Sequence, residues 1–184
     1  MIVSINPCNG EKIAEHKTLN TKESDAAIRS ASAAAKSWSR TSFAERGALL
    51  NKVAATLREM KPELASMMAK EMGKPIKEGG PEVEKAAWCS EHYAEHAEGY
   101  LAREDIPSDA SLSYVSYEPL GTVLGILPWN APLWLAFRFL APSLMAGNTC
   151  VLKHDPLVLG CAAGIAEAFK KAGAPENIVV TLPI

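Results

Sequence analysis

The sequence has 184 residues, which is enough for one domain, or for one domain and part of a second, with a buried core. Its 19 lysines and arginines are balanced by 21 aspartates and glutamates, so the net charge is −2 and no basic stripe is available to bind nucleic acid. Hydrophobic residues make up 48% and charged residues 22%, an ordinary globular balance that argues against disorder. No apolar run approaches the ~18 residues that a membrane span needs.

The cysteines and the N-terminal residues indicate the cellular compartment in which we expect the protein. The cysteines lie far apart and form neither a C-x-x-C pair nor a zinc-binding spacing, so no disulfide framework and no metal site is predicted. Residues 1–10 contain neither the basic region nor the apolar region of a secretory signal. We therefore expect a cytoplasmic protein in which every cysteine is a small buried apolar residue, namely Cys8, Cys89, Cys150 and Cys161.

The N-terminal half is predicted to consist of helices after a short extended start at residues 2–5. Ser42 and Glu45 have the spacing of a capping box, in which the two side-chain oxygens accept hydrogen bonds from free amide groups. Gly73 suits the left-handed residue that ends a helix. Apolar residues three and four positions apart predict helices over residues 22–39, from 42 to about 61, from 62 to 73, and from 81 to 101.

The second half of the chain has a different pattern. Residues 113–117 alternate weakly, as in a strand. Apolar runs at 122–127, 149–152 and 177–182 are then separated by helical stretches at 133–145 and 157–172. Strands and helices that alternate with short connections are typical of a parallel βαβαβ sheet. The predicted fold class is therefore α/β, a helical N-terminal layer followed by a parallel βαβαβ unit.

Asn130 follows the first predicted strand of this unit, at the edge where the ligand site of an open parallel sheet lies. It stands in Pro128-Trp129-Asn130-Ala131-Pro132, where two prolines restrict the backbone and can hold the amide in one orientation. Two compatible interpretations are open. Asn130 caps the helix that Pro132 begins, or its amide serves a functional site.

Lys153-His154-Asp155-Pro156 follows the second predicted strand. Lys153 is either a solvated lysine at a strand end or a donor to ribose hydroxyls or phosphate. His154 and Asp155 are neighbours in extended chain, so their side chains point to opposite faces and are not expected to form a catalytic dyad.

Arg138 lies within the apolar helical stretch 133–145, where a charge is costly unless it is paired or hydrated. Its partner is either a carboxylate of the protein or an anionic ligand, and the sequence does not favour one over the other. The ordinary dinucleotide fingerprint G-x-G-x-x-G is absent, because Gly121 and Gly125 do not have its spacing.

Two segments together resemble the aldehyde dehydrogenase superfamily. They are EPLGTVLGILPWNAP at residues 118–132 and AGNTCVLK at residues 146–153. The resemblance continues through EMGKP at 71–75 and through INP and GE near the start, so it covers essentially the whole chain. The pair Lys153-His154 and the position of Arg138, eight residues beyond Asn130, look like the branch that oxidises succinate semialdehyde.

The resemblance implies an NAD(P)+-dependent oxidation of an aldehyde. In this family a cysteine thiolate attacks the aldehyde, hydride passes to the cofactor, and a water activated by a glutamate hydrolyses the thioester. Asn130 matches the residue whose amide stabilises the oxyanion, and Arg138 matches an arginine that receives the remote carboxylate of the substrate.

The resemblance also implies a set of cofactor-binding residues. Lys153 matches the residue that binds the adenosine ribose. Pro156 stands where many members have an acidic residue that favours NAD, so the choice between NAD and NADP stays open. The implied set is Ile126, Leu127, Pro128 and Trp129 on the nicotinamide side, and Lys153, His154, Asp155 and Pro156 on the ribose side.

Three active-site components of the aldehyde dehydrogenase superfamily have no counterpart in this sequence. They are the nucleophilic cysteine, the general-base glutamate and the pyrophosphate-binding turn. We therefore expect no dehydrogenase turnover from the 184-residue chain by itself. The alternative is a non-catalytic module that binds nucleotide weakly or docks onto full-length subunits.

The resemblance divides the chain into three parts. These are a helical segment at 1–107 that packs on the cofactor domain, an extended oligomerisation-type segment at 108–120, and the first half of an NAD(P)-binding domain at 121–184. It implies a small aldehyde as substrate and a homo-oligomer, with no nucleic-acid or membrane partner. In the family's strand order, the strand at 122–127 has a neighbour beyond residue 184, so we expect an unprotected apolar edge and self-association of the chain.

Overall fold

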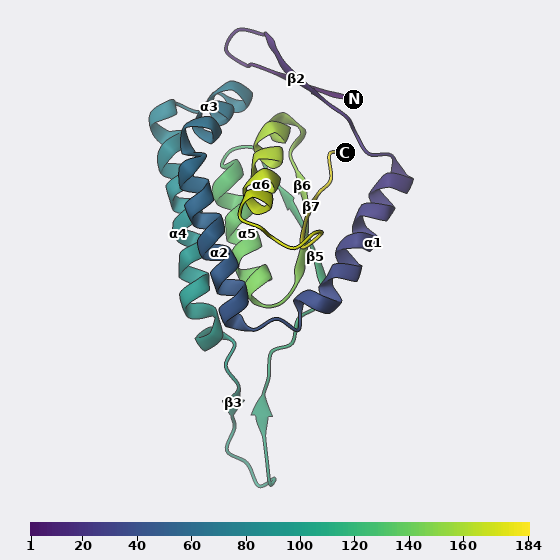
Figure 1. The fold of residues 1–184 in the computed structure, drawn as a ribbon, viewed down its shortest axis with the longest axis vertical. Helices are drawn as coiled ribbons and strands as arrows, with labels where there is room; N and C mark the ends of the chain where they lie inside the picture. The colour runs from purple at the N-terminus through teal and green to yellow at the C-terminus, as the bar shows by residue number, and fades with distance from the viewer.

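The computed structural model describes residues 1–184 and contains a helical layer, a parallel sheet and two projecting hairpins. Figure 1 shows α2, α3 and α4 together on one side, α5 and α6 with the sheet in the middle, and α1 on the other side. No helix has both the length and the apolar composition that crossing a membrane requires. The elements are β1 (Ile2–Ile5), β2 (Lys12–His16), α1 (Thr21–Trp38), α2 (Phe43–Glu59), α3 (Lys61–Met72), α4 (Ile76–Tyr100), β3 (Glu104–Asp105), β4 (Tyr114–Val115), β5 (Thr122–Leu127), α5 (Pro132–Met145), β6 (Thr149–His154), the 3-10 helix η1 (Pro156–Val158), α6 (Leu159–Lys171) and β7 (Val179–Thr181).

The first three helices begin and end close to their predicted bounds. Ser42 and Glu45 form the predicted capping box of α2, and Gly73 ends α3 with a φ of 74°. A second capping box, made by Asn20 and Glu23, starts α1. This box was not predicted from the sequence, although its N-x-x-E spacing has the same physical basis.

The start of α4 was predicted wrongly. The helix begins at Ile76, and Pro81 lies inside it, whereas the prediction placed Pro81 at the start because proline favours the first helical turn. The turn before Pro81 packs closely on α3, since a Cβ added to Gly79 would lie 3.0 Å from the Cα and Cβ of Ala65. This helix-to-helix contact stabilises the extra turn against the loss of the hydrogen bond that Pro81 cannot donate.

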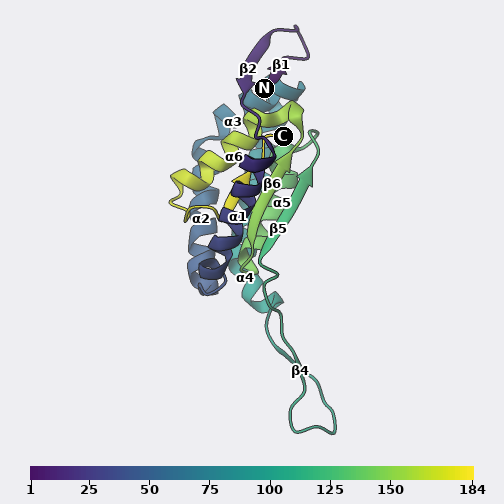
Figure 2. The ribbon, with the colours of Figure 1, turned by 90° about the vertical axis from the view of Figure 1, so that its right-hand side faces the viewer.

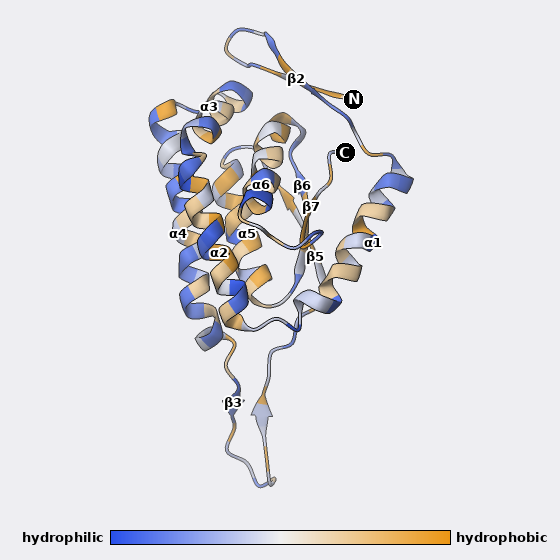
Figure 3. Cartoon of the chain, in the orientation of Figure 1, coloured by the Kyte–Doolittle hydropathy of each residue, from blue (hydrophilic) through white to orange (hydrophobic).

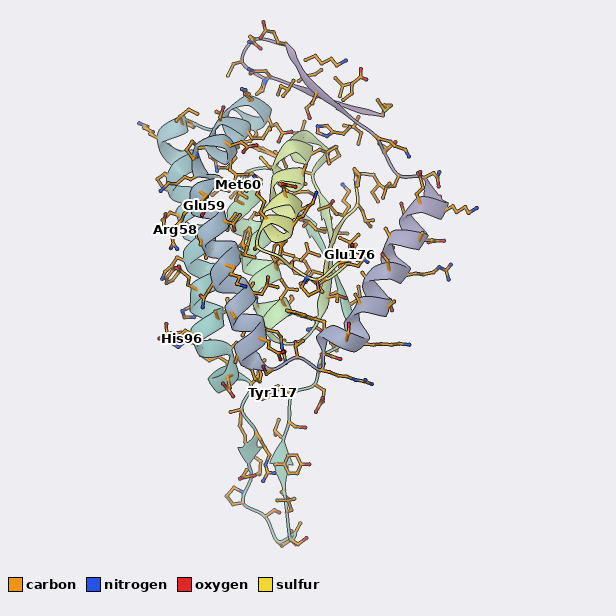
Figure 4. The ribbon with its side chains drawn as sticks, viewed as in Figure 1. Arg58, Glu59, Met60, His96, Tyr117 and Glu176 are labelled. Carbon is orange, nitrogen blue, oxygen red and sulfur yellow. The ribbon has the colours of Figure 1, made fainter.

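Ion pairs on the outer surface join α2 to α4. Arg58 of α2 donates to Glu84 at 2.6 Å and to both carboxylate oxygens of Glu91, one of them at 2.8 Å. The two carboxylates raise the pKa of Arg58, and Arg58 in turn lowers the pKa of both carboxyls. Figure 4 shows Arg58 at the outer side of the helical layer, with His96 farther along α4. Because all three groups are partly exposed, each pair contributes little to stability.

The sheet is parallel, with strand order β5-β6-β7 as the βαβαβ pattern predicts. Cys150 and Leu152 of β6 belong to a cluster of 30 buried apolar residues that also contains residues of α2–α6. The opposite face of the sheet is covered in part by α1, through contacts of Ala31 with Val151 and Leu182, and Figure 2 views the molecule from that side. The helical layer and the sheet therefore share one core.

Three bounds in the sheet unit differ from prediction. β6 continues through Lys153 and His154, because these residues pair with Ile126 and Leu127 of β5. β7 is shorter than the predicted run at 177–182, and the predicted helix at 157–172 is divided into η1 and α6. The extension of β6 matters for the site, because Lys153 and His154 lie within the strand and not after it.

The C-terminal end of α5 is tied to the helical layer by side chains. The indole nitrogen of Trp38 donates to the carbonyl oxygen of Leu144 at 3.1 Å. Arg46 donates to the carbonyl oxygens of Met145 at 2.6 Å and Thr41 at 2.7 Å. A helix leaves its last carbonyl groups without partners, and these donors satisfy two of them. The position of α5 against α1 and α2 is thus fixed at this end.

Two hairpins project from opposite ends of the body (Figure 1). β1 and β2 form one, and residues 101–120, which we call the arm, contain the pair β3 and β4. The sequence pattern predicts only a strand at 113–117 in the arm, and β2 and β3 were not predicted. The Tyr117 hydroxyl donates to Glu104 at 2.9 Å across the root of the arm, where Figure 4 labels Tyr117. Figure 3 shows hydrophobic residues along the arm, and the large exposed ones are Ile106, Leu112, Tyr114, Val115, Tyr117 and Leu120.

The outer edge of β5 is unpaired, and its apolar side chains Leu124 and Ile126 are 55% and 70% exposed. Such an edge pairs readily with another chain. We predict that the purified chain forms oligomers in light scattering coupled to size exclusion, and that Leu124→Lys increases the monomer fraction. Ile76→Lys, at an exposed apolar position on α4, is the control that should change nothing. A monodisperse wild-type monomer would contradict the prediction.

Candidate active site

Asn130 lies between the end of β5 and the start of α5. The N-cap of α5 is Ala131, which makes no side-chain cap hydrogen bond, so the capping interpretation of Asn130 is wrong. The Asn130 side chain is exposed and makes no hydrogen bond within the chain, whereas its carbonyl oxygen accepts from Lys74 Nζ at 3.1 Å. The amide is therefore free for a ligand while its backbone is held.

A shielded ion pair fixes this segment to the start of α5. Glu82 Oε1 accepts from the backbone nitrogens of Leu133 at 2.9 Å and Trp134 at 3.2 Å, and Glu82 Oε2 forms a salt bridge with Lys74. The side chains of Lys74 and Glu82 are only 12% and 7% exposed. Because Lys74 also binds the Asn130 carbonyl, the pair positions Asn130 relative to both α4 and α5.

Glu71 holds the start of α6 in the same way. Its carboxylate accepts from the backbone nitrogens of Gly160 at 2.6 Å and Cys161 at 2.9 Å, and from the Ser4 hydroxyl at 3.2 Å. Helix N-termini bind anions through such free amide groups. Here protein carboxylates occupy the N-termini of both α5 and α6, so neither helix offers a site for a cofactor phosphate.

A hollow of about 560 Å³ lies between α1 and the sheet and contains two of the predicted cofactor residues. Ile126 of β5 and Lys153 of β6 are register partners, and both line the hollow opposite Ser24 and Ile28 of α1. Lys153 is half-buried and forms no salt bridge within the chain, so its ammonium group is available to a ligand. The apolar strand surface and the single cation suit one end of a nucleotide.

Leu127 and His154 face the other side of the sheet, although the sequence analysis grouped them with the cofactor residues. Leu127 packs against the main core, and His154 is 1% exposed. His154 Nε2 lies 3.0 Å from the carbonyl oxygen of Pro132, and Nδ1 accepts from the Asp155 backbone nitrogen at 3.0 Å. These partners require a neutral ring that is protonated on Nε2. The His154 side chain is thus used within the fold and not exposed to a cofactor.

Burial lowers the pKa of His154 below its ordinary value. The unfolded chain then binds more protons than the folded chain, so stability decreases as the pH falls through about 6.5. We predict a lower free energy of unfolding at about pH 5.5 than at about pH 7.5, and a smaller difference in His154→Gln, by urea titration at each pH. His96→Gln, at an exposed position, is the matched control and should keep the wild-type difference. Equal pH dependence in the wild type and His154→Gln would contradict the prediction.

The other residues of the predicted cofactor set lie at the carboxyl edge of the sheet. Pro128 and Trp129 are exposed after β5. Asp155 is the N-cap of η1, where its carboxylate accepts from the backbone nitrogen of Leu157 at 2.9 Å, and the exposed Pro156 is the first residue of η1. The local structure therefore explains why Asp155 and Pro156 stand next to each other, because a capping residue followed by proline starts a helical turn.

Arg138 is exposed on α5 and takes part in none of the salt bridges of the chain, so the protein carboxylate considered from the sequence is not found. Its guanidinium carbon lies 5.6 Å from the centre of the Trp134 ring. Solvent and the face of the Trp134 ring thus accommodate the charge of Arg138. The other partner considered from the sequence, an anionic ligand, is compatible with this geometry.

The three buried cysteines lie in environments that do not activate a thiol. Burial raises the pKa of Cys150 to about 12 and also raises the pKa of Cys89 and Cys161. Cys8 is exposed, contrary to the prediction that all four are buried, because it lies in the turn between β1 and β2. Since the thiolate is the nucleophile, the three buried thiols are poorly suited to attack. No group of three or more side chains is arranged to bind a metal ion.

Comparison with known proteins identifies the family, because residues 1–183 match the pattern of the aldehyde dehydrogenase family. The chain belongs to the aldehyde dehydrogenase family. A similar protein is the probable NADP+ succinate-semialdehyde dehydrogenase of Synechocystis sp., which is 43% identical over 100% of this chain and 40% of its own length. The NAD(P)+ succinate semialdehyde dehydrogenase Sad of Escherichia coli is 38% identical over 96% of this chain and 38% of its own length.

Solved structures support the same assignment to the aldehyde dehydrogenase family. The succinic semialdehyde dehydrogenase of Streptococcus pyogenes, in complex with NADP+, matches 100% of this chain and 41% of its own with a TM-score of 0.95 at 28% identity. The NADP-dependent glyceraldehyde-3-phosphate dehydrogenase of Bacillus halodurans, complexed with NADP, matches 98% and 39% with a TM-score of 0.92 at 33% identity. The chain thus spans about 40% of the length of its curated relatives. These matches confirm the resemblance drawn from residues 118–132 and 146–153, and the predicted α/β fold.

Proposed function

We propose that these residues form the oxyanion-binding and first cofactor-binding part of an enzyme that oxidises succinate semialdehyde to succinate with NAD+ or NADP+. The observation that carries the proposal is the free side-chain amide of Asn130 at the carboxyl edge of the sheet, where Lys74 holds the backbone carbonyl oxygen of the same residue. The names of the Synechocystis and Escherichia coli relatives support the substrate. The proposal assigns residues 1–107 to a helical segment, 108–120 to an extended contact segment and 121–184 to the first half of the cofactor domain.

The residues of this chain have separate roles in the proposed reaction. The Asn130 amide donates a hydrogen bond to the substrate oxygen as negative charge develops on it, and the rigid backbone holds the donor in place before the reaction. Arg138 binds the carboxylate at the far end of the substrate and so orients the aldehyde. NAD+ or NADP+, held in part by Lys153 and Trp129, would supply the hydride acceptor for this oxidation.

The cofactor roles fit only part of an NAD(P) molecule. Lys153 would donate to the ribose hydroxyls from the hollow beside α1, and Ile126, Pro128 and Trp129 would provide an apolar wall on the nicotinamide side. Because Glu82 and Glu71 occupy the N-termini of α5 and α6, the pyrophosphate has to be bound by residues other than these. The nucleophile is likewise not among the buried cysteines, so the chain by itself is proposed to be inactive.

A homo-oligomer is part of the proposal, with the arm as a contact between copies. Leu112 and Leu120 of the arm are 60% and 88% exposed, and Tyr114 is 47% exposed. Apolar side chains that project this far from a small body are typical of a protein–protein contact.

The substrate can be tested in a chimera, in which these 184 residues replace the matching 40% of the Synechocystis relative. The chimera should form reduced cofactor from succinate semialdehyde. Arg138→Met should raise the KM for this substrate by about tenfold or more, because a hydrogen bond to a charged group is lost, and should leave the KM for butanal unchanged. Arg40→Met, at an exposed position, is the control. An unchanged KM for succinate semialdehyde in Arg138→Met would contradict the proposed substrate.

A further inference from the structure

Two cationic side chains lie near the ring of Trp134 on α5. Lys85 Nζ of α4 is 4.1 Å from the centre of the Trp134 ring, and the guanidinium carbon of Arg138 is 5.6 Å from the same centre. The indole ring attracts each of the two cations. Lys85 was not singled out by the sequence, because one lysine on an exposed helix face is ordinary.

The contacts between α4 and α5 explain why Lys85 meets Trp134. Glu82 of α4 binds the backbone nitrogens at the start of α5, and Cys89 Sγ of α4 donates to the carbonyl oxygen of Phe137 at 3.6 Å. The two helices therefore run side by side in the same direction. Lys85 lies between Glu82 and Cys89, so it faces the stretch of α5 that contains Trp134.

Neither cation has a carboxylate partner in the chain. The carboxylates next to Lys85 in the sequence are already engaged, since Glu84 pairs with Arg58 and Lys61, and Glu82 pairs with Lys74. Lys85 and Arg138 are both exposed and take part in no salt bridge. Two like charges at one ring repel each other, and an anion placed between them relieves the repulsion.

Trp134 and Arg138 of this cluster lie close to Asn130 in the sequence. Asn130 lies just before α5, and Trp134 and Arg138 lie within α5, four residues or about one helical turn (roughly 6 Å of rise) apart. Helical side chains lean toward the helix N-terminus, which directs Arg138 back toward Trp134 and Asn130. A short aldehyde with its oxygen at Asn130 thus extends its other end toward the two cations.

We propose that Lys85 and Trp134 form, together with Arg138, a two-cation subsite for the carboxylate of an ω-carboxylated aldehyde. The inference rests on the proposed function, in which Asn130 binds the aldehyde oxygen and Arg138 meets the carboxylate. Lys85 and Trp134 are then specificity-determining residues, which favour a charged substrate over a neutral aldehyde of the same length.

The experiment uses the 184-residue chain, with succinate as the probe and its neutral analogue succinamide as the reference. Saturation-transfer NMR observes the ligand protons and therefore also works if the chain is oligomeric. We expect succinate to bind with a dissociation constant in the millimolar range or up to a few tens of millimolar, and succinamide to give no saturable signal. Lys85→Met keeps the aliphatic stem against Trp134 and removes the charge. It should weaken succinate binding by about threefold or more.

Three further variants make the result specific. Lys85→Arg keeps the charge and should bind like the wild type, and Lys85→Met combined with Arg138→Met should abolish binding. Lys77→Met, also exposed on α4, is the matched control and should bind like the wild type. Far-UV and near-UV circular dichroism confirm that each variant is folded. Wild-type affinity in folded Lys85→Met would overturn the inference, and so would equal signals from succinate and succinamide.

The two proposals can fail separately. If the chimera oxidises succinate semialdehyde and Lys85→Met leaves its KM unchanged, the subsite is wrong and the proposed function stands. If folded chimera oxidises no aldehyde while succinate binding still depends on Lys85, the proposed function is wrong and the carboxylate subsite stands.

Discussion

Replacement of Glu82 by alanine is expected to lower the free energy of unfolding by about 3–5 kcal/mol, because it leaves a shielded ammonium group without its counterion. Lys74 is 12% exposed, and its one other partner is the carbonyl oxygen of Asn130. The same substitution removes the acceptor for the backbone nitrogens of Leu133 and Trp134 at the start of α5. Urea unfolding followed by far-UV circular dichroism measures the effect.

Further variants separate the charge of Glu82 from its hydrogen bonds. Glu82→Gln keeps an acceptor oxygen for the α5 amides but still leaves Lys74 uncompensated, and Glu82→Gln with Lys74→Met should recover part of the loss, because no unpaired charge remains. Glu84→Ala, in a partly exposed ion pair on the same helix, is the matched control and should lower the free energy of unfolding much less than Glu82→Ala does. If Glu82→Ala costs no more than Glu84→Ala, the shielded pair does not hold the start of α5.

Replacement of Asn130 by alanine in the chimera is expected to lower kcat by about 10²–10³-fold, the usual effect of losing one oxyanion donor. The KM should change much less, because the hydrogen bond from the Asn130 amide to the substrate oxygen strengthens only as charge develops in the transition state. Stability should change little, because the Asn130 side chain is exposed and makes no hydrogen bond within the chain. Steady-state kinetics at saturating cofactor give both constants.

The control for this prediction is Asn51→Ala, at an exposed position on α2, which should keep the wild-type kcat. Asn130→Asp removes the donor and adds a negative charge, so it should be at least as slow as Asn130→Ala. A folded Asn130→Ala chimera with a kcat close to that of the wild type would show that Asn130 is not the oxyanion donor.

The parts of the fold that the sequence predicted are those with local causes. The helical bounds follow from capping residues such as Ser42 and from the left-handed Gly73, and both act within one turn. Pro81 was misplaced because its cost is offset by the contact of Gly79 with α3, which no local pattern reveals. β3 is two residues long, and so short a strand has no periodicity to detect.

The residues of the candidate site likewise include some that the sequence predicted and some that only the folded chain brings together. Asn130 and Arg138 were recognisable because each is unusual in its sequence context, one between two prolines and the other in an apolar helix. Lys74 is 56 residues from Asn130, and Glu82 is 51 residues from Leu133, so their pairing appears only in the folded chain. A charge at a buried helix position, such as Glu82 among Val83 and Ala86, is the signal that could have singled it out.

The position at which β6 ends determines which face of the sheet His154 occupies. With β6 ended at Leu152, Lys153 and His154 were grouped at one edge as cofactor residues. The strand in fact continues through His154, and alternation places His154 on the core face with Leu152, and Lys153 on the α1 face with Val151. The extra pairing with β5 is a non-local contact, so the sequence of β6 does not predict it.

We propose that Asn130 provides the oxyanion donor and Lys153 one part of the cofactor site, and that the 184-residue chain does not oxidise aldehydes by itself. The most direct measurement is the absorbance at ~340 nm, where reduced nicotinamide absorbs, for the purified chain and the chimera side by side with succinate semialdehyde and NADP+ or NAD+. We predict reduced cofactor from the chimera and none from the 184-residue chain, with intact mass confirming each sample. Turnover by the chain alone, or a folded chimera that forms no reduced cofactor, would contradict the claim.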